Sequence, residues 1–294
     1  MDGREHTPLH PESRIGTVVL QVGALERSLA FYRDVIGFRV LDRAETPTRT
    51  ARLGVGGSSR VWLGLRERPG ARRVPPRGLV GLYHFAVLLP SRGALGRFFI
   101  HAVNAGREVA SANHLVSEAL YLVDPDGLTI EVYRDVPRHD WRYAGNELQM
   151  ASLPLDADGL VAAADAAPPW DGLPAGTTMG HMHFYVGDLS RAETFYVDGL
   201  GFAPTLRSFP GALFVSAGGY HHHVGLNTWA SHMPEATDED AKLVSWELVV
   251  PDAAALSALA RRLESTGVPV VRNDGRLTAS DPWGITMVAT HPTP

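Results

Sequence analysis

Apolar and polar residues follow the same order in two segments that lie far apart in the chain. VGALERSLAFYRDVIGF, residues 22–38, reappears as VGDLSRAETFYVDGLGF, residues 186–202. An apolar run typical of a β-strand precedes each segment, and apolar positions then recur at helical spacing. Gly37 and Gly201 follow the last helical turn, where a left-handed cap is least costly for glycine. The pattern predicts a repeated strand and helix.

A second pair of similar segments completes the repeat. HFAVLLPSRGAL, residues 84–95, corresponds to SWELVVPDAAAL, residues 245–256, and a proline ends each predicted strand. Further along, DPDG and DPWG are typical of tight turns between two strands. Each unit therefore reads βαβββ. We expect four such modules, which cover residues 15–65, 79–134, 179–229 and 243–290.

One segment interrupts the series of modules. Residues 137–176 are rich in Ala, Asp, Pro and Gly and are too long for a simple turn, so we expect an ordered crossover. It divides the chain into a first domain, residues 12–136, with modules one and two, and a second domain, residues 177–292, with modules three and four. The predicted fold class is α+β, built from tandem βαβββ modules.

Composition narrows the classes of function. A chain of 294 residues with 45% hydrophobic residues buries an ordinary core. The net charge of -5 gives no electrostatic footprint for nucleic acid or an anionic membrane. No apolar run approaches the ~20 residues that span a bilayer, and the polar first residues do not resemble a signal peptide, so we expect a cytoplasmic protein. Since the chain has no cysteine, any metal must be held by His, Asp or Glu.

Candidate metal ligands stand at equivalent points of different modules. Counting from the repeated landmarks places four residues at the same position of the first strand in modules one to four: Thr17, His84, His181 and Ser245. On the last strand, module two has Glu131 and module four has Val288. Glu131 lies between two apolar residues that face the helix, so its side chain faces the opposite side of the sheet. Potential ligands are therefore concentrated in modules two and three.

Further histidines are predicted near these positions. The last strand of module three, YHHHVGLNTW, turns His221 and His223 onto the face of Glu131 if its apolar residues face the helix, and it turns His222 the other way into a structural role. His183 lies two residues beyond His181 on the same face and is expected to line a pocket with His221. His114, which precedes the strand pair of Glu131, either orients groups around the site or is structural, and the structural interpretation is favoured.

These spacings resemble those of the vicinal oxygen chelate superfamily, which includes glyoxalase I, fosfomycin-resistance proteins and extradiol ring-cleaving dioxygenases. The resemblance covers nearly the whole chain, and GHMHFYVGDL, SEALYLVDPDGLTIEVY and AGGYHHHVGLNTW are similar to a two-domain bacterial catechol-2,3-dioxygenase type. It implies that pairs of modules form two half-open barrels with a metal site inside. The implied metal ligands are His84, Glu131 and His181, with His223, His183 and His221 as catalytic or pocket residues.

The resemblance also implies a reaction and a cofactor. The expected function is insertion of O₂ into a catechol-type aromatic diol at a divalent metal, with Fe(II) favoured and Mn(II) as the alternative. Two other interpretations stay open: a glyoxalase- or epimerase-type lyase or isomerase, in which His223 is a fourth ligand, and a small-molecule-binding protein without catalysis. The partners are then a small aromatic substrate and O₂, and a homodimer is left open.

The pairing of modules decides which ligand set forms. Well-known extradiol enzymes draw all three ligands from their last two modules, but module four here offers Ser245 and Val288. If modules three and four share a barrel, the set is His181, His223 and Glu247. If modules two and three share one, His84, Glu131, His181 and His223 converge without substitution, which we favour. His84 and His181 should then lie within about 10 Å of each other, because ligand nitrogens sit ~2 Å from a metal.

Overall fold

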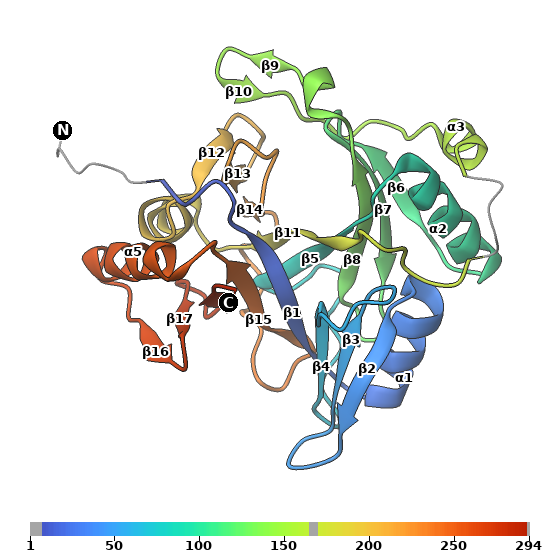
Figure 1. Ribbon diagram of the computed structural model, residues 1–294, viewed down its shortest axis with the longest axis horizontal. Helices are drawn as coiled ribbons and strands as arrows, with labels where there is room; N and C mark the ends of the chain where they lie inside the picture. The colour runs from blue at the N-terminus through green and yellow to red at the C-terminus, as the bar shows by residue number, and fades with distance from the viewer. Residues whose placement is uncertain (1–7, 165–169, 293–294) are drawn as a thin grey trace.

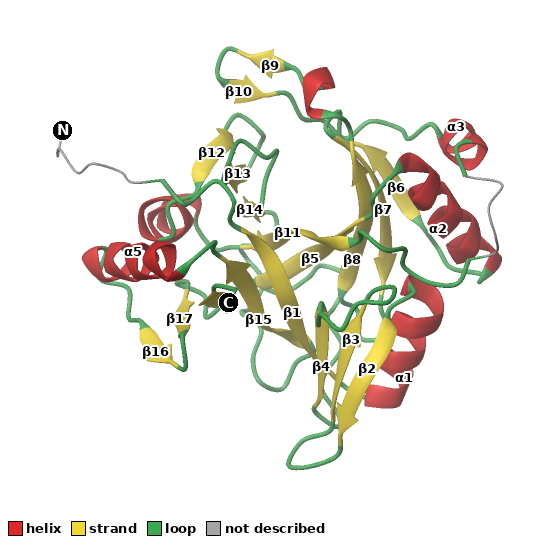
Figure 2. Cartoon of the chain, viewed as in Figure 1, coloured by secondary structure: helices red, strands yellow, loops and turns green. Residues whose placement is uncertain are grey.

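Two eight-stranded sheets with helices on their outer faces form the protein (Figure 1). The computed structural model describes residues 8–164 and 170–292. Each sheet is mixed, and each curls into a half-open barrel, as Figure 2 shows by the yellow strands that surround the centre of the molecule. The predicted α+β class with tandem βαβββ modules is confirmed.

Each module supplies a first strand, a helical segment and three further strands. The strands of modules one and two are β1 (Arg14–Val22), β2 (Arg39–Ala44), β3 (Thr50–Gly54), β4 (Leu63–Glu67), β5 (Gly81–Leu88), β6 (Ala110–Asn113), β7 (Ser117–Val123) and β8 (Thr129–Asp135). Those of modules three and four are β11 (Thr178–Tyr185), β12 (Ala203–Leu206), β13 (Ala212–Ser216), β14 (Val224–Asn227), β15 (Lys242–Val249), β16 (Val271–Asn273), β17 (Arg276–Ser280) and β18 (Thr286–Thr290).

The helices begin and end where local chemistry dictates. They are α1 (Leu25–Phe31), α2 (Arg92–Asn104), α4 (Leu189–Glu193) and α5 (Ala253–Ser265), and π-helical turns extend α1 and α4. At the start of α2 the Ser91 hydroxyl accepts a hydrogen bond from a backbone N–H, and the Asp252 carboxylate does so for α5. Gly37 and Gly201 have φ of 96° and 84°, which confirms the predicted left-handed conformation at both helix ends.

The modules pair in a nested order. Strand β5 of module two pairs antiparallel with β11 of module three, and β1 of module one pairs antiparallel with β15 of module four. The favoured pairing of modules two and three is thus confirmed, and the alternative pairing of modules three and four is wrong. Each sheet combines strands from both sequence-based domains, residues 12–136 and 177–292. The division of the chain into these two domains stays a prediction.

The crossover between modules two and three is ordered over its described part. It carries the short strands β9 (Tyr143–Ala144) and β10 (Glu147–Leu148) and the helix α3 (Ala157–Ala162), which packs near α2 (Figure 1). Residues 165–169 lie outside the described residues. Within the described chain, none of the helices is long and apolar enough to cross a membrane.

Candidate metal centre and adjoining pocket

His84, Glu131 and His181 converge on the concave face of the sheet made by modules two and three. The strand register explains this convergence. Ala86 of β5 pairs with Glu131 on one side and with His181 on the other. His84 lies two residues before Ala86 in β5 and pairs with His183. Side chains alternate across a strand, so all of these residues share one face. One potential ligand atom from each of the three lies within 4.8 Å of the other two, and each residue is buried.

The nitrogen atoms of this group lack the partners that buried polar atoms normally have. His84 Nε2 lies 3.0 Å from Glu131 Oε2, but neither nitrogen of His84 makes a well-formed hydrogen bond. His181 Nε2 lies 3.2 Å from the same oxygen, and its Nδ1 has no partner. Buried polar atoms are usually satisfied, so the orphaned nitrogens call for an additional group. Two imidazoles and one carboxylate fit a divalent metal ion.

Electrostatics suit this group to metal binding. Burial lowers the pKa of both His84 and His181, so the two imidazoles are neutral near pH 7 and keep a lone pair for a metal. Burial alone would raise the pKa of the Glu131 carboxyl, but the interactions with His181 and His84 outweigh it and hold that pKa well below its usual range. The carboxylate is therefore ionised.

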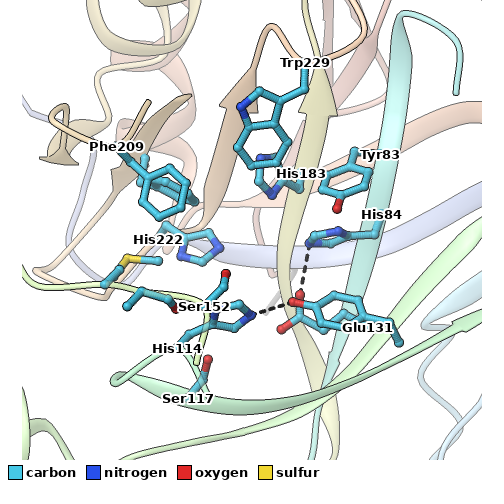
Figure 3. A pocket seen from close by; sticks show the side chains of 14 residues that line it. Tyr83, His84, His114, Ser117, Glu131, Ser152, His183, Phe209, His222 and Trp229 are labelled. Carbon is cyan, nitrogen blue, oxygen red and sulfur yellow. Dashed lines mark hydrogen bonds and ion pairs between the residues drawn. The ribbon is translucent and has the colours of Figure 1, made fainter. Parts of the chain in front are cut away.

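A cavity of about 110 Å³ adjoins His84 and Glu131 (Figure 3). Aromatic rings form much of its wall, from Tyr83, Tyr121, Phe209, Phe214 and Trp229. Among the described residues that line it there is no lysine or arginine. For comparison, an engineered apolar cavity of about 150 Å³ binds benzene. The cavity thus suits a flat, uncharged molecule of about one ring.

The crossover closes one side of this cavity. Met150, Ala151 and Ser152 belong to it and line the cavity directly. His114 fixes the segment in place, because its Nδ1 lies 2.8 Å from the carbonyl oxygen of Ala151. Its Nε2 lies 2.7 Å from the hydroxyl of Tyr121 (Figure 3). The crossover therefore contributes to the site, although its sequence indicated only an ordered connection.

His183 lies where its spacing predicted, in the wall of the cavity. It is buried, and Asn227 Nδ2 donates a hydrogen bond to its Nε2 over 3.0 Å. His114, for which a structural role was favoured, also lines the cavity while it holds the crossover. Both residues remain in the candidate site.

The predicted orientations of the three consecutive histidines, His221, His222 and His223, were wrong. His222 lines the cavity, and its ring centroid lies 4.2 Å from that of His181. His223 is outside the cavity lining; its Nδ1 accepts a hydrogen bond from the amide of Ala217. The physical reason is that β14 begins only at Val224, so strand alternation does not extend back through the histidines.

His221 lies behind His222 rather than in the cavity wall. Its Nδ1 is 2.8 Å from Nδ1 of His222, and its Nε2 is 3.0 Å from Oδ1 of Asp135. The expectation that His221 lines the pocket is corrected accordingly. His221 therefore links His222, in the cavity wall, to the partly exposed carboxylate of Asp135.

Among the residues that the structure describes, the second sheet has no comparable ligand group. Glu247, the substitute carboxylate of the alternative set, accepts hydrogen bonds from the amide of Thr17 and the hydroxyl of Thr290. It therefore braces β1 against β15 and β18. The set of His181, His223 and Glu247 does not form, since Glu247 belongs to the other sheet.

None of the five aromatic residues in the cavity wall was predicted from the sequence, and Tyr121 and Tyr83 show why. Tyr121 pairs with Glu131 across the hairpin of β7 and β8, so counting back from the DPDG turn would have found it. Tyr83 is the extra residue of a β-bulge, because His84 pairs with His183 but Leu82 pairs with Phe184. Bulges re-aim side chains and leave no clear sequence signal.

Comparisons with known proteins agree with the fold. The family model of the Glyoxalase/Bleomycin resistance protein/Dioxygenase superfamily matches residues 14–132 and 178–287. The chain is 41% identical over 281 residues to a protein of Bacillus subtilis (strain 168) named catechol-2,3-dioxygenase, covering 94% of this chain and 96% of that one.

Solved structures are similar in fold at low sequence identity. A candidate dioxygenase from Bacillus subtilis subsp. subtilis str. 168 has a TM-score of 0.68 at 14% identity, covering 98% of this chain and 86% of that chain. Glyoxalase I from Zea mays has a TM-score of 0.58 at 18% identity, covering 95% and 92%. These likenesses concern the fold alone.

Proposed function

The chain belongs to the Glyoxalase/Bleomycin resistance protein/Dioxygenase superfamily, and we propose that within it the protein is a metal-dependent extradiol dioxygenase that opens the ring of a catechol-type diol with O₂. The observation that carries the proposal is the buried group of His84, Glu131 and His181, with its orphaned nitrogens, beside a cavity walled by aromatic rings. The relative named catechol-2,3-dioxygenase supports the same reaction.

The proposed metal is Fe(II), with Mn(II) as the alternative. Two histidines and one carboxylate that leave coordination positions open are typical of non-haem iron oxygenases. When bound, such a metal supplies a template for the diol and O₂ and takes part in the electron transfer between them. His84, His181 and Glu131 would hold it. Their neutral imidazoles and ionised carboxylate are ready for that role near pH 7.

The cavity orients the substrate. Phe214, Phe209 and Trp229 offer flat apolar surfaces to an aromatic ring, and the absence of lysine and arginine among the described lining residues favours an uncharged ring. Burial of the site excludes bulk water, which strengthens electrostatic interactions within it. Asn227 fixes the ring of His183 in the wall.

His222 is the proposed general base. Asp135 accepts a hydrogen bond from Nε2–H of His221, so Nδ1 of the neutral His221 ring carries a lone pair. His221 Nδ1 therefore accepts a hydrogen bond from Nδ1–H of His222. That arrangement leaves Nε2 of His222 with a lone pair to take a proton from a substrate hydroxyl. Burial, together with the neighbouring histidines, holds the pKa of His222 well below its usual range, so the ring is neutral near pH 7 and its Nε2 lone pair is free to face the substrate hydroxyl. His221 acts as its positioning residue.

This assignment replaces His223 in the catalytic role. His223 does not approach the candidate metal group, and among the described residues the group comprises only His84, Glu131 and His181. A glyoxalase- or epimerase-type site with four protein ligands is therefore less well supported than the open site of a dioxygenase.

The test is reconstitution without oxygen. The metal-free protein is incubated anaerobically with Fe(II), then mixed with catechol and air, and the yellow ring-opened product is followed by its absorbance together with O₂ consumption. A protein that retains stoichiometric metal but leaves a panel of catechols unchanged would refute the proposal. Mn(II) in place of Fe(II) tests the alternative metal in the same assay.

A further inference from the structure

A second and larger cavity lies next to the reaction cavity. Its volume is about 540 Å³, and its walls include Arg73, Val74, Val123, Leu128 and Tyr185. These residues come from the connection between modules one and two, from the hairpin of β7 and β8, and from the end of β11. None of them has a part in the proposed chemistry.

Tyr83 forms a wall of both cavities. Its ring centroid lies 4.7 Å from that of His84 and 5.0 Å from that of His183 on the reaction side. It lies 4.6 Å from the ring of Tyr185, which lines only the second cavity. Tyr83 is the extra residue of a β-bulge, and Figure 3 shows its ring beside His84 and His183 in the wall of the reaction cavity. Tyr83 is therefore the residue that the walls of the two cavities share.

The two cavities differ in charge. The reaction cavity contains the Glu131 carboxylate and, among its described lining residues, no cationic side chain. The second cavity contains Arg73, which has no ion pair or side-chain hydrogen bond within the described part of the chain. Arg73 lines this cavity together with the apolar residues Val74, Val123 and Leu128. A guanidinium next to an apolar wall suits a ligand with one carboxylate and a hydrophobic body.

The proposed reaction makes a ligand of this kind. Extradiol opening breaks the bond between a hydroxyl-bearing carbon and its unhydroxylated neighbour, and both atoms of O₂ enter the molecule. One new end is a carboxyl group and the other is an aldehyde or ketone. The carboxyl loses its proton near pH 7, so an uncharged diol becomes a conjugated carboxylate. Such a product has one charge and an apolar body, which Arg73 and the apolar residues of the second cavity suit.

We infer that the second cavity, which we call the product cleft, binds the ring-opened carboxylate as it leaves the reaction cavity past Tyr83, with Arg73 as its counter-ion. The inference rests on the proposed function for the identity of the ligand. The presence of a carboxylate site in the product cleft is tested separately, with a probe that needs no turnover.

The probe is sorbate, a stable six-carbon conjugated monocarboxylate. Its binding to the metal-free full-length protein is measured by calorimetry. We expect Arg73→Gln to weaken binding about tenfold, the loss typical of one charge-assisted hydrogen bond. The matched control is Arg77→Gln, because Arg77 is exposed on the same segment but does not line the cleft. Its affinity should equal that of the wild type.

A second pair of variants tests the cleft by volume. Val123 is 59% exposed at the end of β7, so Val123→Trp adds bulk to the cleft without disturbing the core, and sorbate binding should fall. Val103→Trp, at a 50% exposed site on α2, is the control. Ser152→Trp fills the reaction cavity instead and should leave sorbate binding unchanged. Loss of binding in Ser152→Trp alone would place sorbate in the reaction cavity and overturn the inference.

The holoenzyme supplies the second readout. In Arg73→Gln and Val123→Trp, the first-turnover rate of ring opening should match the wild type, and the inhibition constant for added product should rise about tenfold in Arg73→Gln. If the wild type opens no ring, the proposed function is refuted. The sorbate measurements then show only whether the product cleft binds a carboxylate. If the wild type is active but both variants keep wild-type product inhibition and sorbate affinity, the product cleft alone is refuted.

Discussion

Replacing His223 by asparagine should make the protein more resistant to acid without changing catalysis. His223 is buried, and its Nδ1 accepts the amide proton of Ala217. The asparagine oxygen can accept the same proton but cannot be protonated. Burial, helped by nearby histidines, lowers the pKa of His223 from 6.5 to about 3. The folded protein therefore holds the neutral ring over a pH range in which the unfolded chain binds a proton.

The sign and size follow from proton linkage. Because the unfolded state binds one more proton between pH 6.5 and about 3, stability falls as the pH falls through this window. Each pH unit below the unfolded pKa corresponds to about 1.36 kcal/mol, and the unfolded ring is half protonated at pH 6.5, so His223 removes roughly 2.3 kcal/mol of stability between pH 6.5 and pH 4.5. The asparagine variant lacks this loss. Relative to the wild type, its free energy of unfolding should rise by about that amount over the same interval.

The assay is urea unfolding of the metal-free proteins, followed by circular dichroism at several pH values from 7.5 to 4.5. The other buried histidines contribute equally to both proteins and cancel in the difference. His232→Asn, at an exposed position, is the control and should track the wild type. A difference in unfolding free energy that stays constant with pH would refute the reasoning. An unchanged kcat for ring opening would separate this structural role from the catalytic role that the sequence suggested for His223.

Three further changes test the site and its support. Glu131→Gln keeps the shape but removes the charge, so we expect loss of stoichiometric divalent metal by mass spectrometry and loss of O₂ consumption; retained metal would contradict its role. Gly180→Ala places a Cβ against the hydroxyl of Tyr133 and should lower the free energy of urea unfolding by about 1–3 kcal/mol, whereas an unchanged midpoint would count against this close packing. Met150→Ala enlarges the reaction cavity and should raise kcat/KM for alkyl-substituted catechols relative to catechol itself; equal ratios would show that the crossover does not limit the substrate.

The repeat was sufficient to predict the modules and to place His84, Glu131 and His181 at equivalent positions, and the family resemblance then implied that these three are metal ligands. Strand alternation holds wherever a residue lies inside a strand, so counting from landmarks placed these three on one face. The pairing of modules two and three also followed, because only that pairing brings the three residues together. In long segments with a regular period, the sequence alone therefore indicates which face of the sheet each side chain takes.

The other residues of the candidate site lie where the regular alternation of a strand is interrupted. His222 precedes the first residue of β14, so its direction is set by a loop and its bond to His221. Tyr83 owes its direction to one unpaired residue between two registers. Met150 lies in a crossover without periodicity, and its position depends on tertiary contacts. Such features follow from packing, which local sequence patterns do not encode.

The nested order of the modules has a consequence for synthesis of the chain. Modules two and three are consecutive, so their sheet can assemble as soon as residue 229 has been made. Strand β1 must wait for β15, and the hydrogen bond between Thr17 and Glu247 spans 230 positions. The start of the chain therefore leaves the ribosome with an unpaired strand edge, which is the kind of edge that aggregates. The sheet that holds the candidate metal centre is complete before the part that closes the other sheet exists.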